Sequence, residues 1–228
     1  MKTARVKRSH GPKAAMTEAT YRKKALPHLL ADFNGLCAYC LDPKEFRAAS
    51  QSNVEHFDCK IRGRERHYYK NLMLACAACN MSKHDKPVVN PFDGEQRLLN
   101  CTEENEFLGH IRENSNGEWE ATSKAGHYHL VSIGLTADCH NKKRKARAVM
   151  ANRIFGLLTT AIQYKTVNPE AVHHQLMGAV RDLLQTMENF PPIVTENGVF
   201  TVKEWLKSKG VDLTFLDAPA SPTNWFCD

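Results

Sequence analysis

Apolar residues recur at the three- and four-residue spacing of a helix face in the second half of the chain, as at Ile154 and Leu158. An Asn-Pro pair at 168–169 is typical of a helix start, and Thr201 followed by Glu204 has the spacing of a capping box. These patterns predict a mainly helical C-terminal region. Its helices are expected over 136–164, 168–187 and 201–210.

The first half of the chain has shorter apolar runs that are separated by turn-forming residues. A helix interrupted near Pro27 is followed by short apolar segments with strand character. The pair Asn116-Gly117 predicts a hairpin turn between later strands. The mixture indicates an α+β fold. The expected helices cover 17–33 and 80–85, and the expected strands and apolar segments lie at 53–57, 71–75, 96–99 and within 117–131.

Composition narrows the class of protein. The chain has 228 residues, of which 42% are hydrophobic and 25% are charged, so a largely disordered or collagen-like chain is excluded. It contains no run of about 18 uninterrupted apolar residues, which excludes a membrane-spanning helix. The basic N-terminus lacks the apolar stretch of a secretory signal. We therefore expect a cytoplasmic protein with one or two domains.

The formal net charge is +6 with histidine counted as neutral, and the basic residues are unevenly placed. Lysine and arginine gather in 1–30, 60–70 and 142–147, whereas acids gather in 93–120. Separated basic clusters on a folded chain favour a polyanionic partner such as nucleic acid. An ordinary solvated surface is an equally good interpretation of the charge alone.

Four of the eight cysteines form two pairs of the same spacing, Cys37-Ala-Tyr-Cys40 and Cys76-Ala-Ala-Cys79. Two such pairs separated by a loop are typical of a structural zinc site, because the two-residue gap directs both thiolates of a pair to one metal. Disulfides in a secreted protein are the alternative, which the lack of an export signal disfavours. The other cysteines are expected to be small buried residues or free thiols. These are Cys59, Cys101, Cys139 and Cys227.

Candidate catalytic residues surround the second cysteine pair. Glu55 and His56 are adjacent in an expected strand and point to opposite faces, so one can bind a metal while the other acts on water. Asn80 and His84 are four residues apart on an expected helix and can share one ion. Asn71 lies between these two groups. A zinc site at the second cysteine pair would fix where that helix begins.

In these residues the sequence resembles the HNH nucleases of the ββα-metal class. The resemblance covers about residues 36–86 and is carried by the segments VEHF, YKNLMLACAACN and MSKHDK, framed by the two cysteine pairs. In that family an acid or a histidine precedes the catalytic histidine, an asparagine follows, and a last histidine or asparagine completes the motif. Here the last position is Asn80. The resemblance implies a metal-dependent endonuclease that hydrolyses phosphodiester bonds, with DNA favoured over RNA.

Carried over to this chain, the resemblance implies a role for each residue of the motif. His56 would be the general base that takes a proton from the attacking water, and Asn71 would orient the His56 loop or imidazole. Glu55, Asn80 and His84 would hold one divalent ion, Mg²⁺ or Mn²⁺, with other divalent ions tolerated because of the imidazole. Four basic residues would bind backbone phosphates. They are Arg62, Arg64, Arg66 and Lys83.

The same resemblance implies a zinc-framed ββα-metal nuclease core followed by a mainly helical C-terminal region. We expect a basic N-terminal arm over 1–16, the nuclease core with its structural zinc over 17–90, and an α-rich region over 91–228. A core of this kind needs far fewer residues than the chain has, so the C-terminal region is expected to dock to a partner.

A narrower resemblance is to the PtuB-type nucleases of Septu and retron-associated antiphage defence. It is carried by the order EHF, Tyr-x-Asn-Leu, Cys-Asn and Asn-Pro-Phe-Asp, followed by IGLT before a basic helix. Nucleases of that type act with an ABC/SMC-like ATPase. The resemblance therefore implies an ATPase partner for the C-terminal region.

Two other functions are compatible with the sequence. A stand-alone restriction-type HNH nuclease would need its own sequence-reading element, and no second zinc finger, helix-turn-helix signature or repeat is evident. A non-catalytic zinc-ribbon module that binds nucleic acid would explain the cysteines and the charge. It would not explain why an acid, a histidine and two asparagines occur at the spacing of the nuclease motif.

Overall fold

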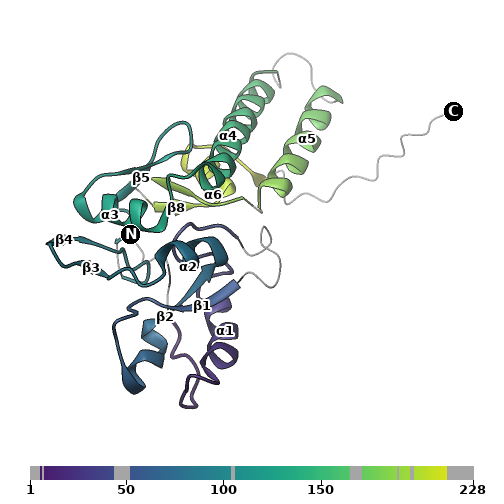
Figure 1. Cartoon of the computed structure of the whole chain (residues 1–228). Helices are drawn as coiled ribbons and strands as arrows, with labels where there is room; N and C mark the ends of the chain where they lie inside the picture. Colours follow the sequence, from purple (N-terminus) through teal and green to yellow (C-terminus); the bar gives the residue numbers. More distant parts are fainter. Residues whose placement is uncertain are drawn as a thin grey trace.

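The computed structural model describes residues 6, 8–43, 52–103, 106–164, 171–188, 190–195 and 198–214. Within these residues the fold is α+β, with small two-stranded antiparallel sheets along the chain and long helices toward the C-terminus (Figure 1). None of the described helices combines the length and the apolar character that crossing a membrane requires. The helices are α1 (Tyr21–Asp32), α2 (Ala77–Lys83), α3 (Lys124–Ile133), α4 (Asp138–Tyr164), α5 (Ala171–Met187) and α6 (Val202–Ser208).

Each described strand pairs with its neighbour in the sequence. The predicted segments at 53–57 and 71–75 are confirmed as the first hairpin, in which Glu55 lies opposite Met73 and His56 lies opposite Leu72. The strand pairs are β1 (Ser52–His56) with β2 (Leu72–Cys76), β3 (Val89–Asn90) with β4 (Asp93–Arg97), β5 (Ile111–Glu113) with β6 (Trp119–Ala121), and β7 (Ile193–Thr195) with β8 (Gly198–Phe200).

The β1–β2 hairpin lies between two helices. On one face His56 packs against Tyr21 of α1, and on the other Glu55 contacts Lys83 of α2. The predicted opposite orientation of these neighbours is therefore confirmed, and it follows from the two-residue period of a strand. α2 begins at Ala77, earlier than expected, because the Cys76 side chain caps it by accepting a hydrogen bond from the Cys79 amide.

The prediction of short strands within 117–131 is confirmed in part. β6 lies there and pairs with β5 across the predicted Asn116-Gly117 turn, with Gly117 at a φ of +80°. The residues after β6 form the helix α3 instead of a further strand. Ser123 caps this helix by accepting a hydrogen bond from the Gly126 amide, and Gly134 ends it in the left-handed conformation.

The predicted helices of the C-terminal region are confirmed as α4, α5 and α6, which share a hydrophobic core. Ile154 and Leu158 of α4 contribute to this core, as the helical spacing predicted. The capping box of Thr201 and Glu204 is present at the start of α6. The predicted Asn-Pro start at 168–169 lies outside the described residues.

The larger hydrophobic core crosses the predicted domain boundary at residue 90. It includes residues from α1, β1 and β2, and also Leu98, Phe107 and Ile133 from later segments. Val194 of β7 reaches the same core. The division expected from the motif therefore does not coincide with a gap in the packing, and the segment after residue 90 helps to support the hairpin.

The predicted N-terminal arm is partly anchored to the fold. Arg8 donates hydrogen bonds to the backbone carbonyls of Tyr69 and Leu72, both at 2.8 Å, and its guanidinium stacks over Tyr69. Val6 is buried in the larger core. Gly11 adopts a φ of +67° and lies so close to the Tyr69 ring that a Cβ atom would clash with it.

Two arginines of the basic run at 142–147 point into the protein rather than toward a polyanion. The side chains of Arg144 and Arg147 are completely buried in α4. Arg147 pairs with Glu113 of β5 and donates to the carbonyl of Pro191 at 2.7 Å. The charge pattern did not reveal this role, because the acidic partner is distant in the sequence.

Candidate active site and metal centre

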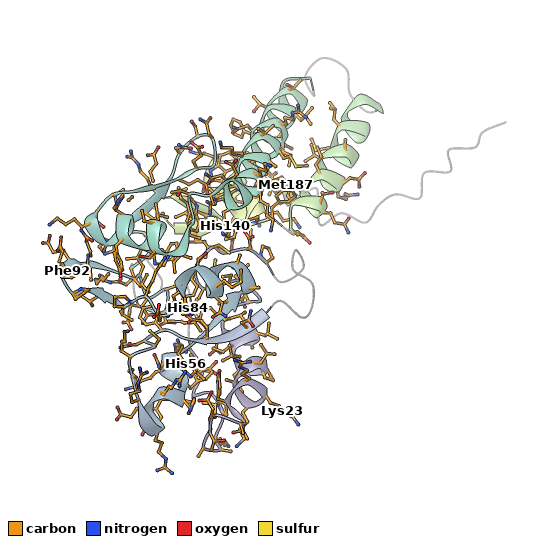
Figure 2. All side chains as sticks on the ribbon, viewed as in Figure 1. Lys23, His56, His84, Phe92, His140 and Met187 are labelled. Atoms are coloured by element: carbon orange, nitrogen blue, oxygen red, sulfur yellow. The ribbon has the colours of Figure 1, made fainter. Side chains whose placement is uncertain are left out.

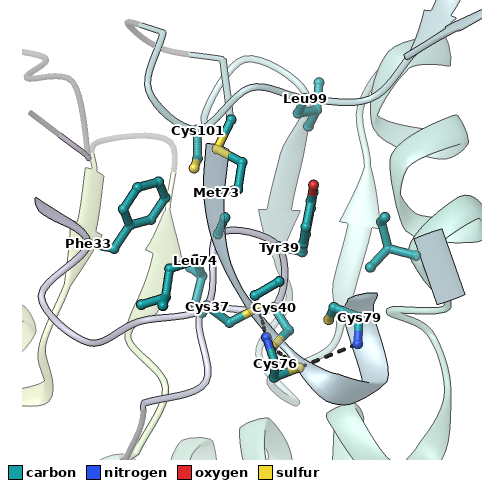
Figure 3. Close-up of a cluster of buried hydrophobic side chains, with 14 of the residues drawn as sticks. Phe33, Cys37, Tyr39, Cys40, Met73, Leu74, Cys76, Cys79, Leu99 and Cys101 are labelled. Atoms are coloured by element: carbon teal, nitrogen blue, oxygen red, sulfur yellow. Dashed lines mark hydrogen bonds between the residues drawn. The ribbon is translucent and has the colours of Figure 1, made fainter. Parts of the chain in front are cut away.

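The four predicted zinc ligands form one buried cluster. Each offers a sulfur atom within 4.8 Å of the other three, and all are unpaired by disulfides (Figure 3). Hydrogen bonds from the neighbouring cysteine thiols hold the pKa of Cys76 far below its usual range, the contribution of Cys37 being the largest. Four buried sulfur atoms at this spacing suit a tetrahedral structural zinc ion. The cluster consists of Cys37, Cys40, Cys76 and Cys79.

Backbone contacts attach the first cysteine pair to β2. The Ala38 amide donates to the Leu74 carbonyl at 2.7 Å, and the Cys76 amide donates to Cys37 Sγ at 3.3 Å. These hydrogen bonds hold the two CxxC turns together through protein atoms alone. A zinc ion here would therefore hold α2 against the hairpin.

The remaining cysteines lie outside this cluster. Cys101 is buried, as one of the two alternatives predicted, and Cys59 is half-buried. The side chain of Cys139 and the whole of Cys227 fall outside the described residues.

Glu55 is directed into the protein, toward α2. Its carboxylate accepts a hydrogen bond from the Tyr39 hydroxyl and lies 3.3 Å from Lys83 Nζ. Burial raises the pKa of Glu55 to about 8, against the opposing effect of the Lys83 ammonium. Lys83 also donates to the backbone carbonyl of His56 at 2.9 Å.

The position of Lys83 differs from the phosphate-binding role expected from the sequence. Its side chain is completely buried, and its ammonium is used by Glu55 and the backbone of β1. A buried cation held by an internal carboxylate cannot reach a nucleic-acid backbone at the surface. In this structure Lys83 joins α2 to the end of β1.

His56 lies in a small polar group on the opposite face of the hairpin. Its Nε2 is 3.2 Å from Nδ1 of His67, and Nε2 of His67 is 3.2 Å from the Glu18 carboxylate. Tyr21 packs against both imidazole rings. Burial, followed by the charges of Arg66 and His67, lowers the pKa of His56 to about 4. The ring is therefore neutral at physiological pH and can accept a proton.

Asn71 fixes the loop that follows His56. Its Oδ1 accepts a hydrogen bond from the Asp58 amide at 2.8 Å, and its Nδ2 donates to the carbonyls of Asp58 and Arg66. Its backbone carbonyl accepts from the Phe57 amide at 2.8 Å. Of the two ways in which Asn71 was expected to orient His56, the contacts of the described residues favour the one through the loop.

Asn80 and His84 lie at the end of α2. The His84 amide donates to the Asn80 carbonyl at 3.0 Å, and the His84 ring is exposed beside Asp85. Among the described residues, no hydrogen bond or ion pair joins either side chain to the carboxylate of Glu55. The donor atoms suit a divalent ion, and their grouping around one ion stays a prediction.

Two of the predicted phosphate-binding arginines are exposed beside the His56 group. Arg62 precedes a 3₁₀ turn over Gly63–His67 and Arg64 lies within it. Both are open to solvent, whereas Arg66 is half-buried and lies 3.8 Å from Glu18. This turn carries both the buried His67 and the exposed cations. A polyanion bound to the turn would therefore lie close to His56.

Sequence reasoning missed Glu18 and His67. Neither lies in the motif that carries the family resemblance, and His67 follows His56 by eleven residues in an arginine-rich loop. Only the position of α1 across the hairpin brings Glu18 to the loop. The contact between the buried His67 and the expected base is visible only in the structure.

Comparison with known proteins identifies the region that holds these residues. Residues 37–86 match the family described as HNH endonuclease. This part of the chain is an HNH endonuclease domain, and the family implies hydrolysis of phosphodiester bonds in nucleic acid. The match includes both cysteine pairs and every residue predicted to act in catalysis. The searches of curated proteins and of solved structures found no match.

Proposed function

We propose that this protein cuts nucleic acid with His56 as the general base of its HNH domain. The observation that carries the proposal is the hydrogen-bonded series from the Glu18 carboxylate through His67 to His56, with 3.2 Å at each step. A neutral, oriented imidazole is what removal of a proton from water requires.

The carboxylate of Glu18 selects the tautomers of both rings. When His67 is neutral, its Nε2–H donates to this carboxylate, which leaves Nδ1 of His67 as an acceptor. Nε2 of His56 then donates to that Nδ1, so the free lone pair of His56 is on its own Nδ1. We propose that this Nδ1 takes the proton of the attacking water.

Two further residues support the position of His56. Asn71 holds the loop after it, and Lys83 holds its backbone carbonyl. Both contacts act on the main chain and leave the imidazole ring available. We propose that they keep the base in place during turnover, as positioning residues rather than catalytic ones.

We also propose the divalent ion that the sequence predicts, with the same three ligands. Glu55, Asn80 and His84 would hold Mg²⁺ or Mn²⁺, and the bound ion would neutralise charge on the scissile phosphate. Because Lys83 occupies the Glu55 carboxylate, the ion would have to compete with this ammonium. Arg62 and Arg64 would bind phosphates on either side of the cleaved bond.

The test is cleavage of DNA and RNA by purified full-length protein, with Mg²⁺ or Mn²⁺. His56→Ala should lower the rate roughly 100- to 10,000-fold. His127→Ala is the matched control, because His127 is exposed on α3, far from the motif in the sequence, and should cleave like the wild type. Full cleavage by His56→Ala would overturn the proposal, and binding without turnover under either metal would favour a zinc-ribbon module.

We further propose that the nuclease is of the PtuB type and works in antiphage defence with an ABC/SMC-like ATPase. The support is the order of short motifs, including the Asn-Pro-Phe-Asp turn, in which Phe92 is almost fully exposed between β3 and β4. Exposed aromatic side chains are common at contacts with other proteins.

Co-expression of the chain with an ATPase encoded beside it tests this assignment. A complex that elutes as one species in gel filtration and is weakened by Phe92→Ser would support it. Two separate peaks, together with sequence-specific cleavage by the chain alone, would favour the stand-alone restriction-type nuclease.

A further inference from the structure

A second group of metal-binding side chains lies beside the four-cysteine cluster. It consists of Cys40, Asp42 and His140, whose ligand atoms all lie within 4.8 Å of one another. All three residues are buried. Cys40 also belongs to the four-cysteine cluster, Asp42 follows it by two residues, and His140 comes from the first turn of α4. His140 lies between the hairpin and the C-terminal helices in Figure 2.

The carboxylate of Asp42 has one oxygen without a partner. Oδ2 accepts from Lys143 at 2.8 Å, whereas Oδ1 is buried and has no hydrogen-bond partner among the described residues. Buried carboxylate oxygens are nearly always paired, so this atom needs an explanation. A carboxylate that binds a metal through one oxygen and accepts a hydrogen bond at the other is the usual arrangement in metal sites.

We propose that Cys40, Asp42 and His140 bind a second zinc ion, with the Cys40 thiolate bridging it to the first. Sulfur, imidazole nitrogen and carboxylate oxygen are the donors that zinc takes from proteins, and three of them leave one position for water. The inference does not depend on the proposed nuclease mechanism, since none of the three residues belongs to the His56 group.

Charge is compatible with a second ion. Four thiolates and Asp42 would place five negative charges around a single Zn²⁺ in a buried region. Lys143 and Arg144 are the cations of α4 that face this region, and the Arg144 guanidinium also donates to the carbonyl of Leu135 at 2.6 Å. With these two cations a single Zn²⁺ leaves one net negative charge and a second leaves one net positive charge, so either occupancy is close to neutral, and the second ion would join α4 to the first CxxC turn.

The test counts zinc in the purified full-length protein, by elemental analysis and by native mass spectrometry. The count is made in a His84→Ala background with excess Mg²⁺, so that the site proposed at Glu55, Asn80 and His84 has only oxygen donors and does not add to the zinc count. This parent chain should hold two zinc ions, and with Asp42→Asn or His140→Ala added it should hold one. Asp42→Asn retains an oxygen for Lys143, so it keeps the test valid if the other variant fails to fold.

His127→Ala is the matched control and should keep both ions, because this exposed histidine lies away from the Cys40–Asp42–His140 group. One zinc ion per parent chain would overturn the proposal, whatever the variants hold. Two ions in both Asp42→Asn and His140→Ala would overturn it as well. Cleavage activity is not part of the readout, so this test can fail while the nuclease proposal stands.

Discussion

Lys83 donates a hydrogen bond from Nζ to the backbone carbonyl of His56 at 2.9 Å. The same ammonium lies 3.3 Å from the carboxylate of Glu55, and both side chains are buried. One internal cation thus links the end of β1 to α2 at the point where the proposed base and the proposed metal ligand are adjacent. The stability of the site and its chemistry are therefore coupled through Lys83.

Replacing this cation should destabilise the fold. Above about pH 8, where Glu55 is ionised, Lys83→Met leaves its carboxylate buried without a partner, and breaking a buried ion pair in this way costs about 3–5 kcal/mol. Urea unfolding should show this loss, and Lys60→Met, at an exposed lysine, should be neutral. The double variant with Glu55→Gln should recover part of the loss. Equal stability of Lys83→Met and the wild type would refute the coupling.

Stability should decrease as the pH rises, through Glu55. Its pKa is about 8 in the folded protein, against an ordinary value of 4.5, so the folded state binds this proton more tightly than the unfolded state does. The contribution is fully present below about pH 4.5 and is lost as the pH rises through about 8. Glu55→Gln removes the titration, so its melting temperature should depend less on pH in this window. Parallel melting curves would contradict the assignment.

Cleavage should persist in mildly acidic solution. Because the pKa of His56 is about 4, its ring stays neutral well below the ordinary histidine value of 6.5, and kcat/KM should decrease only near pH 4. Arg66→Gln removes a charge that lowers this pKa, so the acid limb should move to higher pH. Lys23→Gln, at an exposed cation of α1 with no proposed role in the site, is the control. An unchanged profile in Arg66→Gln would show that another group governs the acid limb.

Loss of one zinc-site thiol should unfold the core. In Cys76→Ser, zinc content should fall and the melting temperature should decrease sharply, because structural zinc contributes folding free energy of about 10–16 kcal/mol in small zinc domains. Cys101→Ala tests a buried cysteine outside the cluster and should keep its zinc. Wild-type protein that is folded and active without zinc would disprove the structural role.

Arg147 should matter for folding rather than for nucleic-acid binding. Arg147→Met leaves Glu113 buried without its cation and removes the hydrogen bonds to Pro191 and Pro192, which predicts a loss of about 3–5 kcal/mol. Lys142→Met, at an exposed position of the same basic run, should leave stability unchanged. Chemical denaturation of both variants checks the difference. If the Arg147→Met and Lys142→Met variants were equally stable, the buried contacts of Arg147 would contribute nothing to the free energy of unfolding.

The sequence predicted most of the nuclease region, because its signals are local. Strand patterns located β1 and β2, and the spacing of the two CxxC pairs located the metal centre. The missed helix α3 also has local signals, since its cap residues Ser123 and Gly134 are present in the sequence but were not used to predict a helix.

The site was only partly predictable, for a different reason. The contacts of His67 and Glu18 with the His56 group, and the burial of Lys83, depend on how α1 and α2 pack on the two faces of the hairpin. The spacing of residues along the chain does not predict how these helices pack on the hairpin. The arginines of α4 show the same limit, because Arg147 finds its acidic partner on β5, which is 34 residues away in the sequence.

The anchoring of Arg8 affects where the nuclease region can be separated from the rest of the chain. A fragment that starts at the predicted boundary, residue 17, would lack the guanidinium that satisfies the carbonyls of Tyr69 and Leu72 on either side of Asn71. A unit that keeps these contacts therefore begins upstream of the family motif, and a deletion that removes Arg8 would loosen the segment that aligns the proposed base.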